Sequence, residues 1–86
     1  MPASYSLRFK SSAENELRRL PKSDLRRILQ RIERLQTEPR PHGCEKLFGE
    51  NVFRVRQGNC RILYLVDDEQ RILEIYKIGH RCEVYR

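Results

Sequence analysis

Residues 52–66 read VFRVRQGNCRILYLV, and their pattern indicates the central part of the fold. Its first six positions alternate between apolar and polar residues, which predicts a strand with one buried face. The Gly58-Asn59 pair that follows is typical of a two-residue hairpin turn. Residues 60–66 are rich in β-branched and aromatic side chains, so they predict the returning strand. An antiparallel hairpin is therefore expected at the centre of the structure.

Two further strands are expected on either side of this hairpin in the sequence. A polar turn at 67–70 leads to a third strand over 71–78, and the alternating stretch 5–9 predicts a strand near the N-terminus. The order predicts an α+β fold: an N-terminal strand, two helices forming a helical hairpin, and a three-stranded antiparallel meander that completes one sheet.

The two helices are expected between residues 12 and 38. The segment from Ser11 to Glu14 matches a capping box, which predicts a helix over 12–20. Pro21 ends this helix because proline lacks a backbone donor. A longer helix follows from Lys22, with apolar residues spaced at three and four positions. This stripe is expected to face the core and comprises Leu25, Ile28, Leu29, Ile32 and Leu35.

Composition favours one folded domain spanning residues 1–86, with 38% hydrophobic and 35% charged residues. No apolar run reaches the ~20 residues of a membrane span, and residues 1–10 lack the apolar stretch of a signal peptide, so the expected location is the cytoplasm. The three cysteines show no CxxC spacing, which fits reduced thiols. A net charge of +6 attracts phosphate backbones, anionic membranes or an acidic protein.

Arginines gather on one side of the expected hairpin. Strand alternation places Arg54 and Arg56 on the same face, and Arg61 joins them if the turn closes. Clustering like charges is unfavourable, and guanidinium groups bind phosphate through two parallel hydrogen bonds. The pattern therefore indicates an anion site, although solvent-facing arginines of a basic sheet remain an alternative.

Several short motifs together resemble the RelE branch of the RelE/ParE toxin superfamily, and the likeness covers nearly the whole chain. The motifs are Leu20-Pro21-Lys22, the segment 38–41, Lys46-Leu47-Phe48-Gly49, Phe53-Arg54-Val55-Arg56, Tyr64, Ile78-Gly79-His80-Arg81 and Glu83-Val84-Tyr85. The resemblance implies a toxin that cuts messenger RNA in the ribosomal A site without a metal, giving 2′,3′-cyclic phosphate and 5′-hydroxyl ends. It also implies a cognate antitoxin protein as partner.

The resemblance assigns roles to particular residues. It implies a catalytic set of Arg56, Arg61, Arg81 and Tyr85, with Arg54 beside it. RNA contacts are expected from Arg54, Arg56, Lys46 and His80. Tyr85 would be the general base, and Arg81 would stabilise the leaving oxygen. His80 competes for the role of base because histidine titrates near neutral pH. Well-studied members carry lysines at the positions of Arg54 and Arg56, and a longer C-terminal tail.

Other readings of the sequence stay open or are set aside. A ParE-type inhibitor of DNA gyrase would share the fold, and a non-catalytic RNA-binding relic would use the arginines only to grip phosphate. The pairs His42/Cys44 and His80/Cys82 do not have the spacing of a zinc module, so no metal is expected. No small-molecule cofactor and no membrane partner are expected either.

Overall fold

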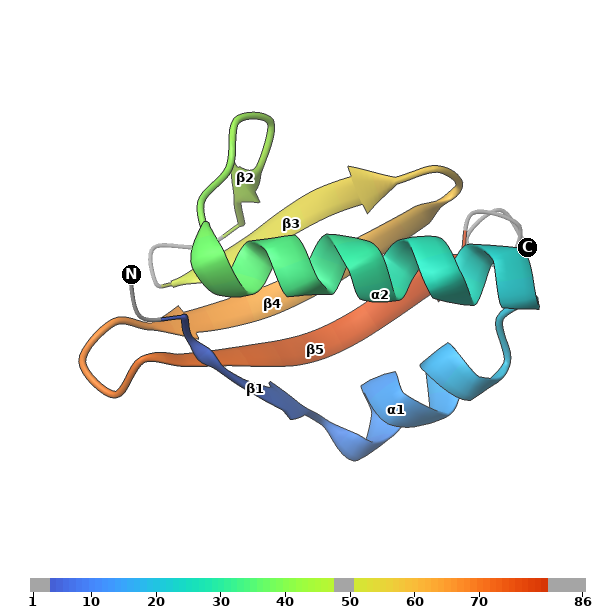
Figure 1. Ribbon diagram of the computed structural model, residues 1–86, viewed down its shortest axis with the longest axis horizontal. Coiled ribbons are helices and arrows are strands. Elements are labelled where there is room, and N and C mark those ends of the chain that lie inside the picture. Colours follow the sequence, from blue (N-terminus) through green and yellow to red (C-terminus); the bar gives the residue numbers. More distant parts are fainter. Residues whose placement is uncertain (1–3, 48–50, 81–86) are drawn as a thin grey trace.

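The computed structural model describes residues 4–47 and 51–80, with His80 described by its backbone alone. The chain forms one mixed five-stranded sheet with the strand order β1-β5-β4-β3-β2, in which only β1 and β5 are parallel (Figure 1). Its elements are β1 (Ser6–Phe9), α1 (Ser11–Arg18), α2 (Lys22–Thr37), β2 (Glu45–Lys46), β3 (Val52–Gln57), β4 (Cys60–Asp67) and β5 (Ile72–His80). The α+β class, the N-terminal strand, the two helices and the meander are confirmed.

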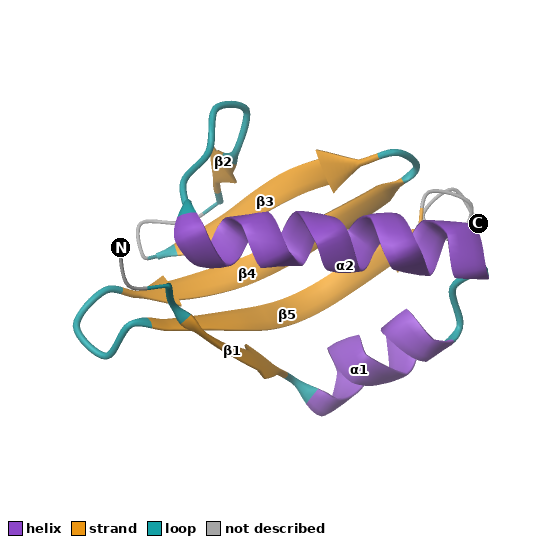
Figure 2. Ribbon diagram, viewed as in Figure 1, coloured by secondary structure: helices purple, strands orange, loops and turns teal. Residues whose placement is uncertain are grey.

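The sheet has two unlike faces. Helix α2 crosses one of them, and α1 lies beside β5 beyond the end of β1 (Figure 2). We call the side under α2 the covered face, where alternate strand residues are buried: Phe53, Val55, Ile62, Tyr64, Val66, Leu73, Ile75 and Ile78. The other side, the open face, carries the residues between them, including Arg54, Arg56, Arg61, Leu63 and Leu65. None of the helices in the described ranges is long and apolar enough to cross a bilayer.

The first helix begins differently from the expectation. It starts at Ser11 with Lys10 at the N-cap, and no side chain caps it. The predicted capping box is therefore wrong, because Ser11 already lies in the first turn and its hydroxyl is not at the capping position. The backbone N–H of Glu14 bonds the carbonyl of Lys10 instead, at 2.9 Å. Pro21 is confirmed as the break, since it forms the N-cap of α2.

The apolar stripe of α2 is confirmed in part. Ile28, Ile32 and Leu35 are each 1% exposed and pack on the sheet, and Leu25 is half-buried. Leu29 is 43% exposed, so its predicted place in the core is wrong. It follows Ile28 by about 100° around the helix axis, which turns its side chain away from the sheet.

The sheet differs from the prediction in two ways: β5 is longer, and β2 is an additional strand. β5 runs on to His80 because Gly79 and His80 continue the pairing with β4. The sequence predicts no strand between α2 and β3, but β2 lies there, and its two residues pair with β3. This short edge strand brings Glu45 opposite Arg54, which matters for the site described next.

Candidate anion-binding site on the open face

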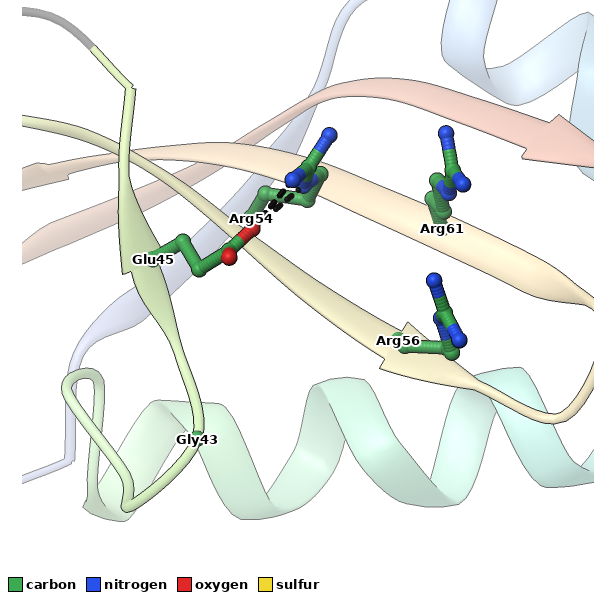
Figure 3. A pocket seen from close by; sticks show the side chains of 5 residues that line it. All are labelled: Gly43, Glu45, Arg54, Arg56 and Arg61. Atoms are coloured by element: carbon green, nitrogen blue, oxygen red, sulfur yellow. Dashed lines mark hydrogen bonds and ion pairs between the residues drawn. The ribbon is translucent and has the colours of Figure 1, made fainter.

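A pocket of about 230 Å³ lies on the open face where β2, β3 and β4 adjoin. Three of its five lining residues are arginines, and Figure 3 shows Arg56 and Arg61 extending to the same side of the sheet. We call Arg54, Arg56 and Arg61 the arginine cluster. Gly43 and Glu45 complete the lining.

The hairpin register places the arginine cluster. Gly58 adopts a positive φ of 61°, which suits the tight turn between β3 and β4. The turn pairs Gln57 with Cys60, so Arg56 lies directly opposite Arg61. Arg54 is two residues away along β3 and points to the same face. The clustering expected from alternation and from the turn is therefore present in the structure.

Glu45 is a lining residue that the sequence analysis missed. The Nε–H of Arg54 donates to Glu45 Oε1 at 3.0 Å, and Nη2 of Arg54 bonds the same oxygen. This hydrogen-bonded ion pair with Arg54 lowers the pKa of the Glu45 carboxyl, with smaller contributions from the charges of Arg56 and Arg61. A strand of two residues has no periodicity, so the sequence carries no signal for this contact.

The other two guanidinium groups of the arginine cluster have no such partner. No carboxylate among residues 4–47 and 51–80 forms an ion pair with Arg56 or Arg61. Like charges directly opposite each other on neighbouring strands destabilise a sheet. The repulsion between Arg56 and Arg61 therefore reduces the stability of the sheet unless an anion binds between the two groups. A phosphate suits this place because its oxygens can accept paired N–H donors of a guanidinium group.

The loop before β2 is fixed at several points, and this positions Glu45. The hydroxyl of Tyr64 donates to the carbonyl of Pro39 at 2.7 Å, and burial raises the pKa of this tyrosine. The guanidinium of Arg40 lies 5.2 Å from the ring centre of Phe53. Gly43 then turns the chain into β2 with a φ of 96°, a conformation that glycine adopts without strain.

A second polar cluster anchors the same loop to the β4–β5 turn. Arg40 donates two hydrogen bonds to the Asp68 carboxylate, from Nη1 at 3.2 Å and from Nη2 at 2.6 Å. The Tyr5 hydroxyl donates to Asp68 Oδ1 at 2.5 Å. The hydrogen bonds from Arg40 and, to a smaller extent, from Tyr5 lower the pKa of Asp68. The hydrogen bond to Asp68 raises the pKa of Tyr5.

The remaining predicted site residues are not brought into this pocket by the described structure. Lys46 pairs with Phe53 rather than with an arginine, so it faces away from the pocket that its neighbour Glu45 lines. The backbone of His80 pairs with Cys60, one residue before Arg61. Arg81 and Tyr85 lie outside the described residues, so their roles stay predictions.

Comparison with known proteins places this fold in a family. The model of the ParE toxin of the type II toxin–antitoxin system parDE matches residues 7–85. Toxin RelG of Mycobacterium tuberculosis is 33% identical over 86 residues, covering 95% of this chain and 97% of that protein. A putative toxin RelE1 of Methanocaldococcus jannaschii is 37% identical over 75 residues, covering 83% of each chain.

A solved structure agrees with these sequence relatives. The toxin–antitoxin complex RelBE2 of Mycobacterium tuberculosis contains a chain that superposes with a TM-score of 0.81 and 30% identity, covering 94% of this chain and 95% of that one. The likeness thus extends over nearly the full length in both sequence and fold. The chain belongs to the RelE/ParE superfamily and is a type II toxin of the RelE family.

Proposed function

We propose that this toxin is an endoribonuclease that cuts messenger RNA bound to the ribosome. The observation that carries the proposal is the arginine cluster, in which Arg56 and Arg61 face each other across two strands without a carboxylate partner in the described chain. An RNA backbone offers this pocket a phosphate that both guanidinium groups can bind. The similarity to toxin RelG and to the putative toxin RelE1 supports the same assignment.

The proposed reaction uses the RNA's own nucleophile. A ribose 2′-hydroxyl loses its proton to a base and attacks the adjacent phosphorus, forming the O2′–P bond. The P–O5′ bond then breaks, and the leaving oxygen takes up a proton from water. The products are a 2′,3′-cyclic phosphate and a 5′-hydroxyl. Arg56 and Arg61 stabilise the negative charge that develops on the phosphorus oxygens, and Arg54 helps to position the backbone.

On the sequence resemblance, Tyr85 is assigned as the base that takes the proton of the 2′-hydroxyl. A free tyrosine has a pKa of ~10, so about 4 kcal/mol is needed for it to act as a base at neutral pH. One cation ~5 Å from the phenolate contributes roughly 3 kcal/mol at an effective dielectric constant of 20. Tyr85 therefore needs at least two arginines close by. Arg81 would stabilise the leaving oxygen.

We further propose that a cognate antitoxin covers the open face with acidic side chains. The RelBE2 structure is a complex of a toxin with its antitoxin, and the net charge of +6 on this chain suits an acidic segment. Association should then be fast at low salt and slower at high salt. Because the proposed substrate is messenger RNA on the ribosome, we expect the toxin to act in the cytoplasm.

A second candidate is poisoning of DNA gyrase, because the matching family model is named for ParE. The two candidates differ in what they damage. Expression without an antitoxin is expected to arrest growth and to produce cleaved messenger RNA, detected by primer extension, while plasmid topology stays unchanged. Altered supercoiling or double-strand breaks with intact RNA would contradict the nuclease and support the gyrase poison.

The assignment of the base has its own test. Tyr85→Phe removes one hydroxyl and is expected to slow single-turnover cleavage by roughly 10²- to 10⁴-fold. His80→Ala is the matched variant, and it should retain most of the activity. If His80→Ala abolished cleavage while Tyr85→Phe left it near the wild-type rate, the base would be the histidine.

A further inference from the structure

The pocket on the open face is lined by one carboxylate of the chain itself, that of Glu45. Glu45 reaches from β2 toward Arg54, as Figure 3 shows, and its Oε1 accepts both the Nε–H and an Nη2 hydrogen of that arginine. These two donors form one of the edges with which a guanidinium group grips a phosphate. The carboxylate therefore occupies the donors that an RNA backbone would use.

The contact between Glu45 and Arg54 is open to solvent, so another group can replace Glu45. The Glu45 side chain is 61% exposed and the Arg54 side chain 35%, so water can replace either partner. Ion pairs at such positions are weak, and the strand that carries Glu45 is two residues long. Arg56 and Arg61 differ from Arg54 because no described carboxylate pairs with them.

We propose that Glu45 is an internal counter-ion that withholds Arg54 from the RNA backbone. A phosphate is bound first by Arg56 and Arg61, and Arg54 joins only when the phosphate displaces Glu45. The inference rests on the proposed function, since it concerns RNA at the same pocket. Glu45 thereby lowers the affinity of the toxin for short polyanions. It favours a longer RNA, because contacts elsewhere keep that RNA bound while its phosphate displaces Glu45 from Arg54.

RNA affinity measured against salt concentration tests this role. The full-length chain is titrated with a short single-stranded RNA that carries 2′-O-methyl groups, because these cannot attack the phosphate. Glu45→Gln keeps the size of the side chain and removes its charge, and is expected to bind about three- to tenfold more tightly at low salt. Its slope of log affinity against log salt should be steeper by about 0.7, the value of one added phosphate contact.

A double-mutant cycle shows whether Glu45 acts through Arg54. Arg54→Ala should cost little affinity in the wild-type chain, where Glu45 already engages the arginine, and more in the Glu45→Gln background. Glu69→Gln is the matched control, since it removes an exposed carboxylate at the β4–β5 turn. It should leave the salt slope unchanged.

The outcomes separate this inference from the proposed function. Weaker or unchanged binding by Glu45→Gln would overturn the inference, and so would an equal cost of Arg54→Ala in both backgrounds. If Arg56→Ala and Arg61→Ala lose RNA binding while Glu45→Gln changes nothing, only the inference fails. If neither arginine variant changes RNA binding, the proposed function fails and the inference fails with it.

Discussion

The covered and open faces belong to the same sheet, but their residues have different roles: those on the covered face pack in the core, and those on the open face contact solvent or a ligand. Along β4, Ile62, Tyr64 and Val66 are 0% exposed on the covered face, whereas Arg61 on the open face is only half-buried. Because side chains alternate, one residue separates a position that stabilises the fold from one that can bind a ligand. Slippage of the register by one residue would exchange the two sets.

Stability and the proposed chemistry can therefore be changed separately in this chain. Arg61 lies between Cys60 and Ile62, which are 1% and 0% exposed. These neighbours hold the strand in place, so the guanidinium group needs no packing of its own. Substitutions on the covered face should therefore act on folding, and those on the open face on binding and cleavage.

The largest expected effect on folding comes from the covered face. Ile75 is 0% exposed, and Ile75→Ala should lower the free energy of unfolding by about 2–5 kcal/mol through lost burial and a remaining cavity. A domain of this size has only ~5–15 kcal/mol to lose, so the variant should unfold at much lower denaturant concentration. Leu29→Ala is the matched control because Leu29 is 43% exposed. Equal losses for both variants would contradict the distinction between core and surface.

A smaller effect is expected where the covered face meets the loop before β2. Tyr64→Phe removes the hydrogen bond to the Pro39 carbonyl and should cost about 1 kcal/mol of unfolding free energy. Tyr76→Phe is the comparison, since Tyr76 is 41% exposed. Urea denaturation measures both variants. A Tyr64→Phe variant as stable as the wild type would show that the loop does not depend on this bond.

The smallest expected effect comes from Asp68, and it depends on pH. The hydrogen bonds from Arg40 and Tyr5 lower the pKa of Asp68 in the folded chain. The stabilisation is therefore fully present above the unfolded-state pKa of ~3.9, and it is lost as pH falls through the folded-state value. Asp68→Asn should lower the melting temperature slightly at pH 7 and give a flatter decline below about pH 4. An unchanged acid decline, measured by circular dichroism, would refute this role for Asp68.

The sequence predicts the parts of this fold that depend on local chemistry. The hairpin follows from alternation and from the Gly58-Asn59 turn, and the arginine cluster follows from that register. The break at Pro21 is equally local, because it comes from the proline ring and its missing donor.

Features set by distant contacts could not be predicted in the same way. β2 and the contact of Glu45 with Arg54 depend on how the loop is fixed by Tyr64, which is 25 residues away from its partner Pro39. Leu29 is exposed because the sheet covers only the side of α2 that carries Ile28, Ile32 and Leu35, and the spacing of apolar residues does not show how wide that side is. The capping box failed because α1 begins one residue earlier than the motif requires.

The most direct measurement compares arginines on opposite sides of the molecule. Single-turnover cleavage of ribosome-bound messenger RNA is followed for Arg61→Ala on the open face and for Arg27→Ala, an exposed arginine of α2. Arg61→Ala should slow cleavage by about 2–4 kcal/mol in activation free energy, or roughly 30- to 1000-fold, while stability changes by less than ~0.5 kcal/mol. Arg27→Ala should cleave at the wild-type rate. Wild-type cleavage by Arg61→Ala, or an equal loss in both variants, would contradict the open face as the site of reaction.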